Sequence, residues 1–274
     1  MKRRFLSSLG CSLLMAGALL IAVTQAVSAG GGADKSGNTL VVGATPVPHA
    51  ELLNLVKDEL KKEGITLKIV EFTDYVQPNS ALISGDLDAN FFQHVPYLKS
   101  NADWTSKLAS AFGVHIEPFG LYSSKFKNIT DLPSGASIAI PNDPTNGGRA
   151  LLLLQSKGLI TLRTDAGLEA TSRDITGNPK NLRFRELEAA LLPRSLGDVD
   201  AAAINGNFAL QAGFNPIGDS LIIEGADSPY VNIVVVQKGK EQDAKIIALK
   251  NALLSQKVKD YINKTYSGGV VAIF

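Results

Sequence analysis

The sequence predicts an α/β protein built from two lobes with mostly parallel sheets. Apolar strand segments alternate with helical segments at short intervals, which is the pattern of βαβ units. A five-residue pattern also occurs twice, as Gly85-Asp-Leu-Asp-Ala89 and as Gly197-Asp-Val-Asp-Ala201. Each copy follows a strand–helix unit and leads into a strand that ends in polar residues, Gln93-His94 in one case and Asn205 in the other. Open α/β sheets bind ligands at such strand ends, and a cleft between lobes is a favoured site.

The strands and helices follow from hydrophobic spacing and from glycine or proline stops. In the first half we expect a strand over 39–43, a helix over 49–63, a strand over 67–72, a short helix over 80–84 and a strand over 88–92. In the second half we expect strands over 137–140, 183–187, 199–204 and 231–236, and helices over 148–157, 188–196 and 243–266.

The N-terminus has the organisation of a secretory signal peptide. Lys2-Arg3-Arg4 precede an apolar run over about 13–27, which ends in the small residues Val27-Ser28-Ala29. The run is shorter than the roughly 20 apolar residues that a spanning helix needs. We expect cleavage after Ala29, so that 1–29 is the signal and 30–38 a flexible tether; the alternative is a retained N-terminal anchor.

Charge and cysteine content exclude several classes of protein. Loss of the three leader cations leaves 24 basic residues against 26 acidic ones, a net charge near −2, so there is no basic footprint for nucleic acid. Cys11 is the only cysteine, so the exported chain can form neither a disulfide nor a cysteine-based zinc site. Leu9-Gly10-Cys11 resembles a lipoprotein cleavage site, but the apolar run follows Cys11 when it should precede it. We therefore expect a free, soluble exported protein over a lipid-anchored one.

The sequence does not support catalysis. It contains no G-x-S-x-G, H-E-x-x-H, Walker or G-x-G-x-x-G motif. The three histidines, His49, His94 and His115, are far apart in sequence and are poor material for a metal site. We expect no cofactor and no metal.

Arg149 is the strongest single candidate for ligand binding. It follows Asn146-Gly147-Gly148 and is expected to open an apolar helix, where free amides and the helix dipole attract anions. An arginine can hold a carboxylate through two charge-assisted hydrogen bonds, each worth about 1.5–3 kcal/mol. The alternative is a surface arginine in an ion pair at a helix end. A cation in the first turn opposes the dipole, which favours the ligand role.

Four ring-bearing residues are predicted to form an aromatic cage: Tyr75, Phe92, His94 and Tyr97. Amide side chains are interleaved with them, which makes a purely apolar setting unfavourable: Gln77, Asn79, Asn90 and Gln93. For Phe92 the cage and an ordinary core position stay equally open. Phe91 should point to the opposite side of the strand and belong to the core.

Asparagines at strand ends complete the predicted site. Asn205 ends an apolar strand and Asn232 interrupts another, and a buried asparagine needs hydrogen-bond partners. Turn backbone could supply those partners. The neighbouring rings and Arg149 favour contacts with a ligand's amide or ammonium group instead. Asn146 is less certain, because Asn-Gly also forms plain turns.

Several segments resemble the NlpA-type methionine-binding proteins, over nearly the whole mature chain. They are Thr73-Asp-Tyr-Val-Gln-Pro-Asn79, Gly85-Asp-Leu-Asp-Ala-Asn90, Phe92-Gln-His94, Pro96-Tyr-Leu98, Pro141-Asn-Asp-Pro-Thr-Asn146, Asn178-Pro-Lys180, Leu192-Pro-Arg194 and Asp227-Ser-Pro-Tyr-Val-Asn232. The resemblance implies a periplasmic solute-binding fold with two crossovers of the type II kind. It implies a first lobe of residues 39–122 and 234–274 and a second lobe of residues 123–233.

The resemblance also implies a function and a role for each candidate. It implies capture of L-methionine or a close analogue by a periplasmic monomer, and delivery to the permease and ATPase of an ABC importer. The side chain would be surrounded by Tyr75, Phe92, His94 and Tyr97. The carboxylate would lie near Asn146 and Arg149, and the polar end near Asn205 and Asn232. Two features depart from the family pattern. Cys11 is misplaced for an anchor, and Gly206-Asn207 stand where relatives often carry bulkier residues.

Two other classes of function remain as alternatives. One is an enzyme on the same scaffold with His94 as a base, and the other is an exported adhesive or structural protein without a small ligand. Turnover of an amino acid that His94→Ala abolishes would identify the first. The absence of any thermal shift with a panel of amino acids would identify the second.

Overall fold

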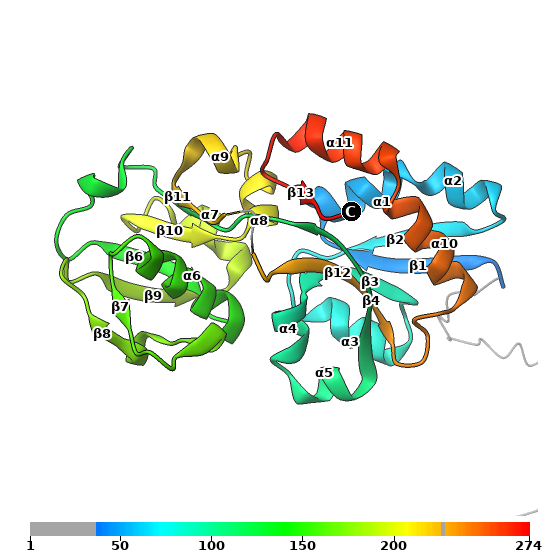
Figure 1. The fold of residues 1–274 in the computed structure, drawn as a ribbon, viewed down its shortest axis with the longest axis horizontal. Helices are drawn as coiled ribbons and strands as arrows, with labels where there is room; N and C mark the ends of the chain where they lie inside the picture. The colour runs from blue at the N-terminus through cyan, green and yellow to red at the C-terminus, as the bar shows by residue number, and fades with distance from the viewer. Residues whose placement is uncertain (1–36, 226–227) are drawn as a thin grey trace, which may run out of the picture. The chain divides into compact units, whose positions relative to one another are not determined.

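The computed structural model describes residues 37–225 and 228–274 (Figure 1). The expected signal peptide, Cys11 and most of the expected tether lie outside the described residues, as does Asp227 of the last motif. Among the described residues, no helix is both long and apolar enough to cross a bilayer.

The first sheet has the strand order β13-β4-β12-β3-β1-β2. Its strands are β1 (Thr39–Ala44), β2 (Thr66–Glu71), β3 (Ala89–His94), β4 (Leu108–Ile116), β12 (Val231–Gln237) and β13 (Val271–Ala272). β1 pairs in parallel with β2 and β3, whereas β12 is antiparallel to β3 and β4. β13 is antiparallel to β4 at the edge.

The second sheet has the order β11-β5-β10-β6-β9. Its strands are β5 (Gly120–Tyr122), β6 (Ser137–Pro141), β9 (Arg183–Leu187), β10 (Ala201–Ile204) and β11 (Ser220–Ile223). β6 pairs in parallel with β9 and β10, and β5 is antiparallel to β10 and β11. A separate ribbon joins β7 (Thr161–Leu162) to β8 (Ile175–Gly177).

The expectation of mostly parallel sheets is confirmed, since β1, β2, β3 and β4 run one way in the first sheet and β6, β9, β10 and β11 run one way in the second. Both sheets are nevertheless mixed, because β12 and β13 run against the first set and β5 runs against the second. β5 and β12 each follow directly after a passage of the chain between the sheets. Hydrophobic spacing identifies such strands but does not report their direction. The prediction of a two-lobe α/β fold is confirmed.

The chain passes from the first sheet to the second between Ile116 and Gly120, and it returns between Ile223 and Val231. Strand pairing therefore puts Gly120–Tyr122 with the second sheet and the start of β12 with the first. The lobe boundaries expected from the sequence stay a prediction, and sheet membership favours moving both by about three residues.

Short helices cover the sheets (Figure 1). They are η1 (Pro46–Ala50), α1 (Glu51–Leu55), α2 (Lys57–Lys62), α3 (Gln77–Ser84), α4 (Val95–Lys99), α5 (Ala102–Lys107), η2 (Ile129–Asp131), α6 (Pro144–Ser156), η3 (Gly167–Glu169), η4 (Ser172–Asp174), η5 (Ala189–Leu191), α7 (Leu192–Ser195), α8 (Gly206–Gln211), α9 (Pro216–Asp219), α10 (Ala244–Leu253) and α11 (Gln256–Tyr266). The single helix expected over 243–266 is therefore two helices. They meet at Ser255, which is extended and serves as the N-cap of α11.

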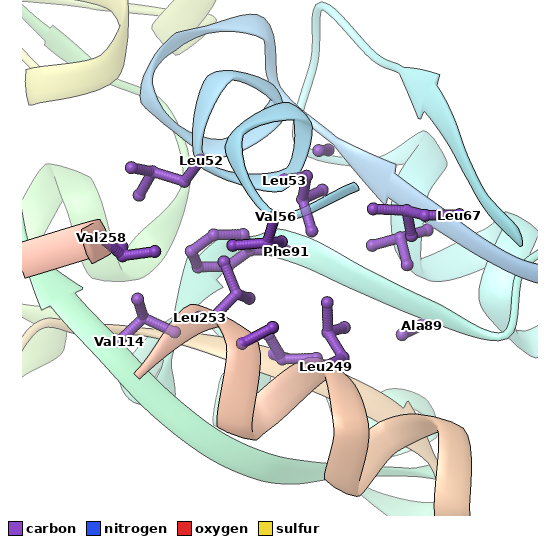
Figure 2. Packing of buried hydrophobic residues seen from close by; sticks show 14 of the residues in the cluster. Leu52, Leu53, Val56, Leu67, Ala89, Phe91, Val114, Leu249, Leu253 and Val258 are labelled. Carbon is purple, nitrogen blue, oxygen red and sulfur yellow. The ribbon is translucent and has the colours of Figure 1, made fainter. Parts of the chain in front are cut away.

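The core of the first lobe lies between its sheet and its helices. Figure 2 shows Phe91 of β3 near Leu53 of α1 and Leu253 of α10. Phe91 has no exposed surface, which confirms its predicted core position. Full burial of such a side chain stabilises the fold by about 1.5–3 kcal/mol.

The repeated five-residue pattern forms the same local structure in both lobes. In the first copy, Asp88 Oδ2 accepts a hydrogen bond from the backbone N–H of Val41 in β1, at 2.8 Å. In the second copy, Asp200 Oδ2 accepts one from the N–H of Ser137 in β6, also at 2.8 Å. Each aspartate thus fastens the strand that comes after it, β3 or β10, to its parallel neighbour.

Candidate functional site

A cavity with an empty volume of about 320 Å³ lies where β3 and β10 end. Its lining comes from both lobes: Tyr75, Phe92, Gln93, His94, Tyr97, Glu117, Asn146, Arg149, Asn205, Gly206, Asn207 and Asn232. All eight residues predicted as a ligand site are among them. Their assignment to a ligand stays a prediction, but the structure brings the eight together around one space.

The rings form one wall of the cavity. The Tyr75 ring centroid lies 5.9 Å from that of Phe92 and 5.8 Å from that of Tyr97. Phe92 and Tyr97 are 6.1 Å apart in a T-shaped arrangement. Phe92 is only 4 % exposed, so it is at once a core residue and part of the wall. The two interpretations left open for Phe92 are therefore compatible.

His94 is buried and neutral, and both ring nitrogens are used. Its Nδ1 lies 3.1 Å from the backbone N–H of Tyr97, which donates to it, so the ring hydrogen belongs on Nε2. Nε2 then donates to Asn146 Oδ1 at 3.1 Å. Burial, and secondly the charge of Arg149, lower the pKa of His94 to about 3. With its lone pair occupied and its pKa so low, the ring is a poor general base.

Asn146 joins the two walls. Its Oδ1 accepts from His94 and from Asn205 Nδ2, the latter at 2.8 Å, while its Nδ2 donates to the Asp143 carboxylate at 3.0 Å. The amide is thus fully used among described residues. This geometry favours a supporting role for Asn146 over a direct contact with a carboxylate.

Arg149 does not lie in the first turn of its helix, so that expectation is wrong. α6 begins at Pro144, with Asp143 as its N-cap accepting from Asn146 N–H at 2.9 Å, which places Arg149 in the second turn. The aspartate–proline pair, and not the two glycines, starts the helix. Gly148 is needed for packing, because a Cβ there would lie 2.2 Å from the carbonyl oxygen of Leu168.

The Arg149 guanidinium is buried and donates hydrogen bonds to residues of both passages between the sheets. Its Nε donates to Glu224 Oε1 at 2.8 Å, and Nη2 donates to Glu224 Oε2 and to the Glu117 carbonyl oxygen. The group also lies over the ring of Tyr230, 4.1 Å from the centroid. The ion pair that was the alternative for Arg149 therefore exists, but it is not a surface pair, since Arg149 is 3 % exposed. Nη1 makes no hydrogen bond among the described residues and is free for a ligand.

Glu117 lines the cavity and was not identified from the sequence. Its Oε1 lies 2.8 Å from His115 Nε2 and 3.3 Å from His49 Nε2. Burial raises the pKa of Glu117, and the neighbouring His49 and Arg149 oppose that rise. A Cβ on Gly206 would lie 2.7 Å from the Cβ of Glu117. The absence of a side chain at position 206 therefore leaves the space that Glu117 occupies. The one available signal was a lone acid within the apolar run 114–119.

Three asparagines line the cavity together with Glu117: Asn205, Asn207 and Asn232. Asn205 Oδ1 and Asn207 Nδ2 are buried and have no partner among the described residues. Asn232 Oδ1 accepts from His49 Nε2 at 3.1 Å. Asn207 also accepts from the Tyr75 hydroxyl through Oδ1, at 2.6 Å, which joins the two lobes across the cleft. The lining of the cavity therefore offers both hydrogen-bond donors and acceptors.

The group His49, His115 and Glu117 has donor types that suit a metal ion, and their ligand atoms lie within 4.8 Å of one another. However, His115 Nε2 and Glu117 Oε1 are only 2.8 Å apart. Two ligands of a tetrahedral zinc, with bonds near 2.0–2.2 Å, are about 3.3 Å or more apart. Direct hydrogen bonds account for this geometry.

Two α/β lobes joined twice around a polar and aromatic cavity define a solute-binding protein. The sequence is matched by the model of the NlpA lipoprotein family over residues 40–274, and the chain belongs to this family. The resemblance noted in the sequence is thereby confirmed.

Individual relatives agree with this assignment. The methionine-binding lipoprotein MetQ of Bacillus subtilis is 42% identical over 271 residues, covering 95% of this chain and 98% of the relative. A nutrient binding protein from Burkholderia cenocepacia, solved bound to methionine, is 47% identical, with a TM-score of 0.83 over 86% of this chain and 100% of that one. A periplasmic substrate-binding protein of an ABC transporter from Coxiella burnetii is 43% identical, with a TM-score of 0.81 over 85% and 99% of the two chains.

Proposed function

We propose that this protein captures L-methionine or a close analogue between its lobes and delivers it to an ABC importer. The observation that carries the proposal is the mixed lining of the cavity, which combines Arg149, Glu117 and unpaired asparagine atoms with three aromatic rings. A zwitterion with an apolar side chain matches both kinds of group. The names of the relatives from Bacillus and Burkholderia support methionine, and that of the Coxiella protein supports the importer.

The zwitterion contacts account for most of the affinity in this proposal. The ligand carboxylate lies at Arg149 Nη1, and the ammonium lies near Glu117 and Asn205. Tyr75, Phe92 and Tyr97 surround the thioether, with His94 and Asn146 completing the wall. Sulfur–aromatic contacts add only about 0.3–1.5 kcal/mol each, less than the about 1.5–3 kcal/mol of a charge-assisted hydrogen bond. The rings therefore serve selectivity.

Calorimetry with protein stripped of ligand tests the proposal. Wild type should bind L-methionine, and Arg149→Ala should bind it about 100-fold more weakly or worse, because a buried charge contact is lost. Arg163→Ala is the matched control, since Arg163 makes an exposed ion-pair cluster with Asp165 and Asp174. Absence of binding by wild type, or equal affinity in Arg149→Ala, would contradict the proposal.

The enzyme alternative is less well supported. The relatives are named as binding proteins, and the lone pair of His94 is occupied by a backbone N–H. Mass spectrometry of an amino-acid panel after incubation with the protein would expose any turnover. The adhesive alternative predicts no thermal shift with any amino acid. Ligand at about 100 times its dissociation constant should instead add near 2.7 kcal/mol to the free energy of unfolding.

We also infer that the protein works as a monomer outside the cytoplasm, partnered by a permease and its ATPase. The family and several relatives are named as lipoproteins, one of them as a membrane lipoprotein, which runs against our expectation of a free form and favours an anchor. Intact mass and N-terminal sequencing decide the form. A chain that begins at Gly30 would support cleavage after Ala29, and an acylated chain that begins at Cys11 would support the anchor.

A further inference from the structure

Two buried histidines form a second layer behind the cavity. His49 in η1 and His115 in β4 have no exposed surface, and neither lines the cavity. Both direct Nε2 at the same oxygen, Oε1 of Glu117. Residues that are 66 positions apart in sequence thus meet behind a single cavity carboxylate.

Hydrogen-bond partners fix the protons of this layer. His49 Nδ1 lies 2.7 Å from the Thr45 hydroxyl, while its Nε2 faces Asn232 Oδ1 and Glu117 Oε1. A nitrogen between two acceptor oxygens carries the hydrogen, so Nε2 donates and the Thr45 hydroxyl donates to Nδ1. His115 Nε2 donates to the same Oε1, and its Nδ1 has no partner among the described residues. Two N–H groups directed at one oxygen suit an ionised carboxylate.

The groups around Glu117 differ in whether they favour its ionised or its neutral form, and the histidine N–H donors favour the ionised form. Burial alone raises the pKa of Glu117 and favours the neutral acid. Arg149 opposes this, but its guanidinium is paired with Glu224 on the far passage between the lobes. The other titratable groups nearby, Tyr75 and Tyr266, stay neutral because burial raises the pKa of each. His49, Arg149 and the backbone N–H of Asn207 on α8 favour the carboxylate, and the His115 N–H, with Nε2 2.8 Å from Oε1, is a further donor to it.

We propose that His49 and His115 are positioning residues that keep Glu117 ionised and aimed at the cavity, which makes a free α-ammonium group a requirement for binding. This inference rests on the proposed function and adds a rule of selectivity to it. An N-acylated amino acid lacks the cation and leaves the buried carboxylate without a partner. Protonation of Glu117 has the same consequence for methionine itself, so affinity falls as the pH falls.

The test compares four variants by calorimetry between pH 4.5 and pH 8, within the range where circular dichroism shows each to be folded. His115→Leu removes one N–H donor, and His115→Gln keeps a side-chain N–H near the position of Nε2. Glu117→Gln removes the titrating carboxyl, and Gln237→Leu is the control. Gln237 donates to the Leu82 carbonyl oxygen at 2.9 Å, at the far end of β12, so its loss costs a hydrogen bond elsewhere in the same sheet.

In wild type and Gln237→Leu, the dissociation constant for L-methionine should rise about tenfold per pH unit below the midpoint of Glu117. His115→Leu should move that midpoint up by about one to two pH units, the equivalent of one charge-assisted hydrogen bond. His115→Gln should restore most of the shift, and Glu117→Gln should remove the pH dependence. Wild type should bind N-acetyl-L-methionine about 100-fold more weakly than L-methionine, or not at all.

A purely structural role for the histidines would give a different pattern. His115→Leu would then weaken binding equally at every pH, with an unmoved midpoint, and that result would overturn the inference. Binding of N-acetyl-L-methionine within tenfold of L-methionine would overturn it as well. Failure of wild type to bind L-methionine at any pH would instead remove the proposed function, so the two failures are distinguishable.

Discussion

The two copies of the repeated pattern can be compared directly, because each fastens one strand that ends at the cavity. Asp88 ties β3 to β1 and Asp200 ties β10 to β6 through the same backbone hydrogen bond. The two fastened strands differ in length and composition. β3 has six residues and ends in Phe92-Gln-His94, whereas β10 has four residues, all alanine or isoleucine, and leads to Asn205. The strand after the first copy therefore places the rings of Phe92 and His94 at the cavity. The strand after the second copy places the amide of Asn205 there, next to Gly206.

The two lobes share the backbone scaffold but differ in the side chains that they place at the cavity. The aspartates and the parallel pairing recur in both lobes, yet each lobe builds a different wall from the residues beyond them. All three histidines belong to the lobe of β3, and the lobe of β10 has none. This asymmetry leads to measurable differences between the lobes.

The largest expected effect is acid destabilisation of the β3 lobe. Burial lowers the pKa of His49 to about 4, and the pKa of His94 and His115 to about 3, from the ordinary value of 6.5. Below pH 6.5 the unfolded chain binds protons that the folded chain does not, so stability is present above that pH and is lost as the pH falls. Each histidine contributes about 1.4 kcal/mol per pH unit, and together about 4 kcal/mol per unit.

Urea unfolding at pH 7, 6 and 5 measures this slope, and hydrogen exchange at pH 5 locates it. Protection should be lost in β1, β3 and β4 before β6 and β10. Equal protection in both lobes, or a free energy of unfolding that does not change from pH 7 to pH 5, would contradict the asymmetry.

A smaller effect is expected from the repeated aspartates. Asp88→Ala and Asp200→Ala should each destabilise the protein by about 1–3 kcal/mol, because each leaves a strand N–H without its acceptor. Urea unfolding checks both. Asp86→Ala and Asp198→Ala are matched controls, since they replace the exposed first aspartate of each copy and should change stability little. Sensitivity in only one copy would break the equivalence of the two structures.

The smallest effect concerns one of the hydrogen bonds between the two walls, the bond from Tyr75 to Asn207. Tyr75→Phe removes the hydrogen bond to Asn207 and should weaken methionine binding about 3- to 10-fold, which corresponds to about 0.5–1.5 kcal/mol. Calorimetry measures it, with Tyr261→Phe on α11 as a control far from the cavity. Unchanged affinity would mean that this bond does not help to hold the lobes together around the ligand.

The sequence was sufficient for most of the elements and for a set of side chains that lie around one cavity. Hydrophobic spacing located the strands, and strand ends with rings, amides and Arg149 formed that set. The reversed direction of β5 and β12 was not predictable, because an apolar pattern is the same whichever way a strand runs. The start of α6 was also missed, since Asp143-Pro144 resembles a turn as much as a helix cap.

Glu117 could not be identified for a different reason. Its role depends on His49, His115 and Gly206, which come from three separate elements and have no local sequence relation to it. Lone histidines without a motif are poor candidates for a metal site, and the distances around His49 and His115 agree with hydrogen bonding. Their relation to Glu117 exists only in three dimensions.

The position of Arg149 has a consequence for the timing of binding. Its guanidinium is held by Glu117 and Glu224, which lie on the two passages between the lobes, so opening of the lobes to admit the proposed ligand would leave it at the passages. The rings of β3 and the amide of Asn205 lie on opposite lobes and would move apart. An amino acid would then attach by its carboxylate before its side chain is enclosed. Association rates should then be similar for different amino acids, and discrimination should appear in how long each one stays bound.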